Sequence, residues 1–146
     1  SDTYPEASAA MNLMLFSWVQ ALGRHWAVYA SNAADVYLGT QLAQDASRFV
    51  TYGVDHVRSH LHARPLQAEA LADHLDMCEN ALVGALGAPE MIEPLLLASG
   101  GFEPVAAFYA RTADEYFRRC DAAGLGDRRD ASALTPFLRM LQGDSR

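Results

Sequence analysis

Carboxylates and histidines are the side chains with which this sequence could hold a metal ion or move a proton. His56 and His60 lie four residues apart, with Asp55 beside the first, so a helix would place both imidazoles on one face. Near a helix end, however, histidines also interact favourably with the last carbonyl groups. A carboxylate-bridged metal pair in a helix bundle needs a Glu from each of two helices and a Glu-x-x-His motif from each of two others. No Glu stands between Glu6 and Glu69, and none precedes a His by three residues, so the sequence predicts no metal site and no cofactor in this chain.

Asp45 and Arg48 lie three residues apart in an otherwise apolar stretch. On a helix this spacing places both side chains on one face, where a carboxylate and a guanidinium can pair. Because an unpaired charge in an apolar interior is strongly destabilising, we expect a buried or half-buried structural ion pair with no catalytic role. Replacing Arg48 by Met would then cost more stability than replacing an exposed arginine, for which Arg128 serves as the example.

Composition argues against several other functions. The chain has 146 residues and a net charge of -7, whereas a surface that follows nucleic-acid phosphates needs clustered positive charge. No apolar run has the length of a membrane span, and no signal peptide is recognisable. Cys78 and Cys120 fit neither a disulfide framework nor a zinc site, so we expect two free thiols and a reducing compartment, the cytoplasm. The first residue is Ser1 instead of Met, which suggests a processed chain or a piece of a longer one.

The elements that must position these side chains are helices. β-Branched residues are scarce, Ala and Leu are abundant, and apolar residues recur at spacings of three and four. The acidic side chains Asp76 and Glu79 are expected on a solvated face, and residues 127–130 are expected to form a polar linker. Pro and Gly mark the helix ends. The sequence predicts one all-α domain over residues 1–146, with helices at 9–30, 32–63, 65–86, 89–97, 103–123 and 131–142, the first two being separate or one long kinked helix.

The first predicted helix is apolar nearly all the way round. Other helices of a domain this size can cover one face of it and part of the flanks, and soluble monomers avoid leaving the remainder exposed. We therefore expect another polypeptide or a second copy of the chain to cover it. The candidate interface residues are Met11, Met14, Leu15, Trp18, Leu22 and Trp26.

The run Leu-Ala-Gln-Asp-Ala-Ser-Arg-Phe-Val-Thr-Tyr, residues 42–52, resembles a helix of the bacterial multicomponent monooxygenase hydroxylases. That family acts on toluene, phenol and methane and has ferritin-like subunits. Its catalytic subunits carry an Asp-Glu-x-Arg-His run there, in which Glu and His bind iron. Its non-catalytic subunits carry a Leu-Ala-x-Asp-x-x-Arg run followed by an aromatic residue. Here Asp45 and Arg48 stand where the ligands would fall, and Arg cannot bind iron.

The resemblance extends over about residues 32–61 and implies the C-terminal half of a non-catalytic subunit, a ferritin-like helical bundle or partial bundle. Such a chain would be a scaffold for a di-iron hydroxylase acting on hydrocarbon or aromatic substrates, in contact with hydroxylase subunits or with its own copy. One alternative is a fragment of a catalytic di-iron oxygenase whose ligands lie outside this chain. Another is a helical dimerisation or apolar-ligand-binding module. Two equivalents of iron per chain would overturn the scaffold hypothesis.

Overall fold

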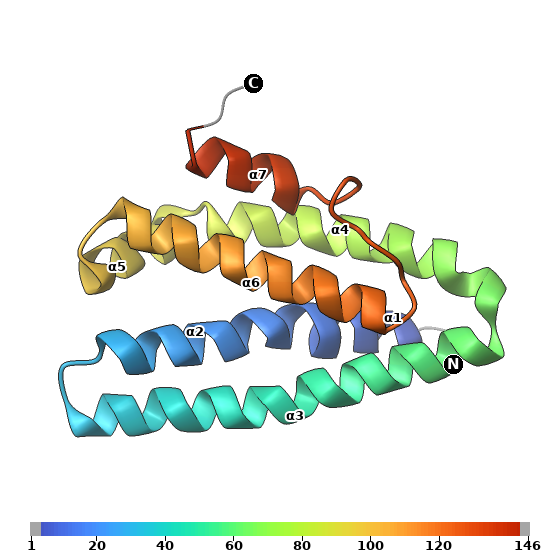
Figure 1. Ribbon diagram of the computed structural model, residues 1–146, viewed down its shortest axis with the longest axis horizontal. Coiled ribbons are helices and arrows are strands. Elements are labelled where there is room, and N and C mark those ends of the chain that lie inside the picture. Colours follow the sequence, from blue (N-terminus) through green and yellow to red (C-terminus); the bar gives the residue numbers. More distant parts are fainter. Residues whose placement is uncertain (1–3, 144–146) are drawn as a thin grey trace.

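The chain folds into an all-α helical bundle (Figure 1). The computed structural model describes residues 4–143, and these residues form no β-strand. The fold class predicted from the sequence is therefore confirmed. In chain order the helical elements are α1 (Tyr4–Ser8), η1 (Ala9–Leu15), α2 (Phe16–Tyr29), α3 (Ala33–Ala63), η2 (Pro65–Gln67), α4 (Ala68–Leu86), α5 (Pro89–Ser99), α6 (Phe102–Ala122) and α7 (Leu134–Leu141).

The first helical segment differs from the prediction in its start and in its geometry. It begins at Tyr4 instead of Ala9, and η1 is a π-helix between two α-helical pieces. A π-helical turn holds more residues than an α-helical turn, so it changes the direction in which later side chains point relative to earlier ones. The even α-helical spacing assumed for residues 9–30 therefore holds only from Phe16 onward.

The helices α2 and α3 are separate. The backbone of Ala30 is extended, and the Oδ1 atom of Asn32 accepts a hydrogen bond of 2.9 Å from the backbone N–H of Asp35. Asn is a preferred cap because its side-chain oxygen satisfies an N–H group that has no partner within the helix. At its other end α3 stops at Ala63, just before the Arg64-Pro65 pair that the sequence identifies as a helix break.

Glycines allow the two helices of the α2–α3 hairpin to approach each other closely. A Cβ atom at Gly23 would lie 2.8 Å from the carbonyl oxygen of Gly39, and one at Gly39 would lie 2.7 Å from the carbonyl oxygen of Gly23. Farther along α3, a Cβ atom at Gly53 would lie 2.8 Å from the Cβ atom of Asn12 in η1. A larger side chain at any of these positions would have to push the helices apart.

The interior is centred on α6, which contacts η1, α2, α3, α5 and α7. Tyr109 and Tyr116 of α6 are fully buried. The Tyr109 hydroxyl donates a hydrogen bond of 2.9 Å to the carbonyl oxygen of Leu86 at the end of α4, and its ring meets Trp18 of α2 edge to face at 5.7 Å. On the side of α6 away from the hairpin, α7 packs on α4 and α6 (Figure 1). The hairpin is therefore the outermost part of the bundle on its side.

Candidate functional site

Asp45 and Arg48 form an ion pair, but outside the interior. The Nη1 atom of Arg48 lies 3.4 Å from Oδ1 of Asp45, while the Arg48 side chain is 81% exposed and that of Asp45 is 63% exposed. The prediction of a buried or half-buried pair is therefore wrong. The two residues lie on a side of α3 that no other helix of the described chain covers.

Helix α3 carries two adjacent stripes of mainly apolar residues. The first stripe faces α2 and η1 and consists of small or aliphatic buried residues, among them Gly39, Ala46 and Val50. The second is offset by one residue and repeats at alternating spacings of four and three, which keeps its members on one helix face. Its members are Leu38, Leu42, Asp45, Phe49, Tyr52 and His56. Of these, Leu38, Phe49 and Tyr52 are about half exposed, at 51%, 47% and 47%.

A matching stripe on α2 continues this surface. Its first residue, Leu15, ends η1, and Trp26 at its other end is 42% exposed. On the opposite side of α2, Ser17 and Gln20 accept hydrogen bonds of 3.0 and 2.6 Å from Arg119 of α6, so the stripe is turned away from α6. We call the two stripes together the open face: Leu15, Val19, Leu22 and Trp26 of the first segment with Leu38, Leu42, Phe49 and Tyr52 of α3.

The ring of Phe16 stacks on that of Phe49, with ring centroids 4.5 Å apart, and thereby joins the two halves of the open face. At the C-terminal end of the stripe on α3, Tyr4 of α1 covers part of the surface. Its hydroxyl lies 2.7 Å from that of Tyr52, and its ring meets His56 edge to face at 4.9 Å. The open face is therefore bounded by α1 at this end.

The six predicted interface residues divide between the core and the surface. Met14 and Trp18 are 6% and 5% exposed beneath helices of this same chain, so they belong to the core and not to the predicted interface. Met11 and Trp26 are 48% and 42% exposed, and Leu15 and Leu22 are half-buried. The remaining four residues therefore stay available to a partner.

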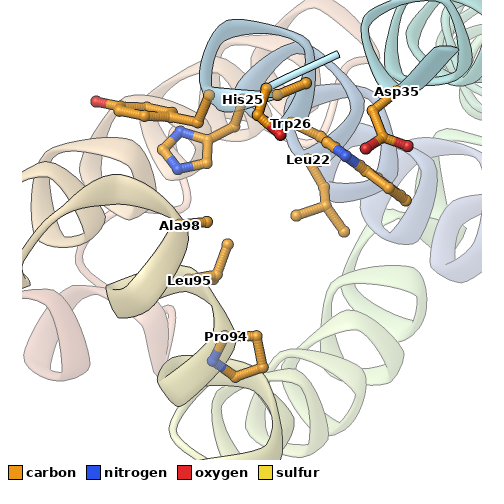
Figure 2. Close-up of a pocket in the computed structure, with 10 residues that line it drawn as sticks. Leu22, His25, Trp26, Asp35, Pro94, Leu95 and Ala98 are labelled. Carbon is orange, nitrogen blue, oxygen red and sulfur yellow. The ribbon is translucent and has the colours of Figure 1, made fainter.

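An apolar cavity of about 420 Å³ lies at one end of the open face, between the α2–α3 turn and α5 (Figure 2). Leu22 points into it from α2, and Pro94 and Leu95 line it from α5 (Figure 2). Its volume falls within the range of small-molecule sites. Its lining residues are Leu22, His25, Trp26, Tyr29, Ala30, Ser31, Asp35, Pro94, Leu95 and Ala98.

His25 is the buried titratable group beside this cavity. Its Nε2 atom lies 2.7 Å from the Ser99 hydroxyl oxygen, and its ring stacks on Phe108 with centroids 4.4 Å apart. Burial, with the nearby Arg111 guanidinium, lowers the pKa of His25 below its ordinary value of 6.5. The imidazole is therefore neutral at neutral pH, and it can exchange a hydrogen bond with Ser99 without placing a charge in the interior.

A buried polar cluster joins α4, α6 and the segment that follows α6. Glu79 is fully buried, and its Oε1 atom accepts hydrogen bonds of 2.6 Å from the Tyr116 hydroxyl and 3.1 Å from Nε of Arg128. Arg128, only 4% exposed, also donates a hydrogen bond of 2.6 Å to Asp76. Burial, with the negative charge of Glu79, raises the pKa of Tyr116 well above its ordinary value. The predictions that Glu79 is solvated and that Arg128 lies in an exposed linker are wrong.

His56 and His60, whose four-residue spacing could place both imidazoles on one metal ion, make separate contacts within the chain. His56 packs against Tyr4 and Tyr52, and the Nε2 atom of His60 lies 2.6 Å from Oε1 of Gln67. Within residues 4–143, no three or more His, Cys, Asp or Glu side chains are grouped so that they could hold a metal ion.

Both cysteines are free thiols, as predicted. Cys120 is fully buried, and burial raises its pKa to about 12. Cys78 is half-buried, and burial raises its pKa as well. Neither thiol is therefore activated as a nucleophile at neutral pH.

No family model matches the chain, and neither a curated protein nor a solved structure is significantly similar to it.

Considering the described part of the chain, no single helix is both long and apolar enough to cross a membrane. Residues 65–86 and 89–99, which meet at a bend of 58°, reach that length and composition only as a pair.

Proposed function

We propose that this chain is a non-catalytic helical scaffold subunit that assembles through its open face. The observation that carries this proposal is the open face itself. It is a mainly apolar surface, interrupted by Asp45, that repeats at the spacing by which helices pack together. Among residues 4–143, α1 covers its Tyr52 end, while Trp26, Leu38 and Phe49 stay about half exposed. Surfaces of this kind on soluble proteins mark sites of association.

The total surface of the chain agrees with this proposal. The accessible area is 8233 Å² for a mass of 15.9 kDa. A folded monomer of this mass has an area of about 7,400 Å² by the usual scaling with mass. The excess of roughly 800 Å² over this scaling value is close to the area that each partner buries in a protein–protein interface of standard size.

We propose further that the assembly to which this chain belongs is a di-iron hydroxylase acting on hydrocarbon or aromatic substrates, and that another subunit holds the metal. This further proposal rests on the resemblance of residues 32–61, most of which lie on α3, the helix that contributes half of the open face. In ferritin-like subunits, helices from earlier in the chain complete the bundle, and the open face has the pattern to receive such helices. The two free thiols agree with a reducing compartment such as the cytoplasm.

The test is purification of the tagged chain from its native cells, with iron analysis and mass spectrometry of whatever is bound. We expect an iron-containing hydroxylase subunit in stoichiometric amount, lost in Phe49→Asp and retained in Tyr37→Asp. Tyr37 is a matched control because it is an aromatic residue of α3, 68% exposed, that lies outside the open face. Absence of an iron protein, or equal recovery with both variants, would overturn the proposal. Two equivalents of iron on this chain alone would favour the catalytic-fragment alternative.

A second candidate function, binding of a small apolar molecule, is favoured by the cavity beside α5. Naphthalene is a suitable probe because an aromatic ring can pack between Leu22 and Leu95, next to the indole of Trp26. We expect a saturable change in Trp26 fluorescence, absent from Ala98→Phe, in which the added ring fills the cavity. An unsaturable change, or the same change in Ala98→Phe, would argue against this function.

A further inference from the structure

We infer that the occupant of the open face is a second copy of this chain, packed antiparallel so that the outer stripes of the two α3 helices cross at the level of residue 47, on a two-fold axis. This inference rests on the proposed function and specifies the partner. Three features of α3 lead to it: the symmetry of its outer stripe, the position of one ion pair at the edge of that stripe, and the place where α1 limits access.

The outer stripe of α3 is symmetric about residue 47. In an antiparallel pair centred there, Leu42 faces Tyr52 of the second copy, and Asp45 lies across from Phe49 of the second copy. A two-fold interface requires such self-complementarity, because each contact occurs twice. Since Tyr4 of α1 contacts Tyr52 and His56, the second helix cannot follow α3 to its C-terminal end. It must cross at an angle, as helices with interlocking side-chain ridges commonly do.

Charge complementarity fixes the register of this crossing. Asp45 and Arg48 lie close to the dyad, so in the dimer each Asp45 lies beside Arg48 of the second copy on the same edge of the contact. Four charges then alternate in sign at the centre of an apolar interface. Within one chain the same two side chains are largely exposed and 3.4 Å apart, which leaves their remaining hydrogen-bonding capacity to a partner. Sliding one helix along the other would separate each Asp45 from Arg48 of the second copy, and this disfavours other registers.

The test is a mixing experiment with charge-reversed variants, measured by sedimentation equilibrium. Asp45→Arg places four positive charges at the dyad of a homodimer, and Arg48→Asp places four negative charges there. We expect each variant alone to dimerise at least about tenfold more weakly than the wild type, because like charges that face each other across an interface are strongly unfavourable. An equimolar mixture of the two should regain dimers, since every charge then meets its opposite on the other chain.

Asp55 and Arg58 provide a matched control, because they form another exposed ion pair with the same three-residue spacing on the same helix. We expect Asp55→Arg and Arg58→Asp to leave dimerisation unchanged, alone and mixed. A monomeric wild type, dimers that tolerate charge reversal at 45 and 48, or a mixture that stays monomeric would each overturn this inference. A monomeric wild type that still retained an iron protein through Phe49 would overturn only the second-copy occupant and leave the scaffold function standing.

Discussion

The α2–α3 hairpin and the α4–α6–α7 side of the molecule use similar sequence patterns with opposite results. In α6, large side chains such as Tyr109, Tyr116 and Phe117 are buried on a face that neighbouring helices cover. In α3, the buried positions hold mostly small or aliphatic residues, and aromatic residues such as Phe49 and Tyr52 lie half exposed on the next stripe. One side of the chain thus completes its own core, whereas the other presents a surface suited to a partner.

The same contrast appears in the charged residues. Arg128 and Glu79 are paired in the interior, with exposed fractions of 4% and 0%, whereas Arg48 and Asp45 are paired in water. Among residues 4–143, the Oε2 atom of Glu79 has no hydrogen-bond partner, so the contacts that hold the buried pair there go to the other carboxylate oxygen. We therefore expect an ion pair to be sensitive to mutation where water cannot replace the missing partner.

The largest effect is expected from Arg128→Met, which leaves the buried Glu79 carboxylate without its counter-ion. Removing one partner of a buried pair costs about 3–5 kcal/mol. Denaturant unfolding would measure the loss, with Arg129→Met as the control because the side chain of Arg129 is 40% exposed. The double variant Glu79→Gln with Arg128→Met should recover part of the stability. Equal losses in the Arg128 and Arg129 variants would refute the difference between buried and exposed pairs.

A smaller loss, about 1–3 kcal/mol, is expected from Gly39→Ala, because the new methyl group must push the two helices of the hairpin apart. Gly84→Ala is the matched control, since Gly84 lies inside α4 and its Cβ would meet no atom within 4 Å. Replacing that glycine should stabilise the protein by about 0.5–1 kcal/mol. If Gly39→Ala were also stabilising, this would refute the conclusion that α2 and α3 are too close together to admit a methyl group at position 39.

The pH dependence of stability should contain a contribution from His25. Because its pKa is lower in the folded protein than the ordinary 6.5, the unfolded chain binds the proton first as the pH falls. The stabilising contribution is therefore complete above pH 6.5 and is lost as the pH falls below that value and through the folded pKa. Unfolding free energies measured at successive pH values should show this decline, and His25→Gln should flatten it. If the unfolding free energy of His25→Gln declined with falling pH as steeply as that of the wild type, His25 would be excluded as the cause of the decline.

The smallest effect is expected from Arg48→Met, at most about 1 kcal/mol in the monomer, because exposed ion pairs contribute little. The sequence alone predicts the reverse order, with Arg48 more important to stability than Arg128. The melting temperatures of Arg48→Met and Arg128→Met, measured under conditions that dissociate the dimer, decide which variant loses more stability. A larger drop in melting temperature for Arg48→Met would support the order predicted from the sequence.

Local signals were sufficient to predict most of the helices. Asn32 caps α3, Pro65 ends it, and Gly100, with a φ of 77°, ends α5, each through the conformational preference of its own residue type. The π-helix η1 has no comparable sequence signal. The difference at residues 9–15 therefore could not be predicted from apolar spacing, which assumes α-helical geometry throughout.

Burial was harder to predict because α3 has two apolar stripes and the sequence does not say which of them its own chain covers. Asp45 interrupts the stripe that stays open, and Glu79 follows Leu71 and Leu75 at four-residue spacing on a stripe that is covered. The two acidic residues thus have similar local surroundings in sequence and opposite environments in the structure. Glu79 could have been identified as buried from this spacing, but its partner Arg128 lies 49 residues away in a polar stretch that has no such pattern.

Sedimentation equilibrium of the isolated chain at micromolar concentration tests directly whether the open face is a surface for assembly. We expect a wild-type species of twice the 15.9 kDa chain mass, a monomer for Phe49→Asp, and a dimer for Tyr37→Asp. A monomeric wild type whose hydrodynamic behaviour is unaffected by Phe49→Asp would contradict assembly of the isolated chain through this face. Equal dissociation by both substitutions would show that exposed aromatic residues in general, and not the open face, hold the assembly together.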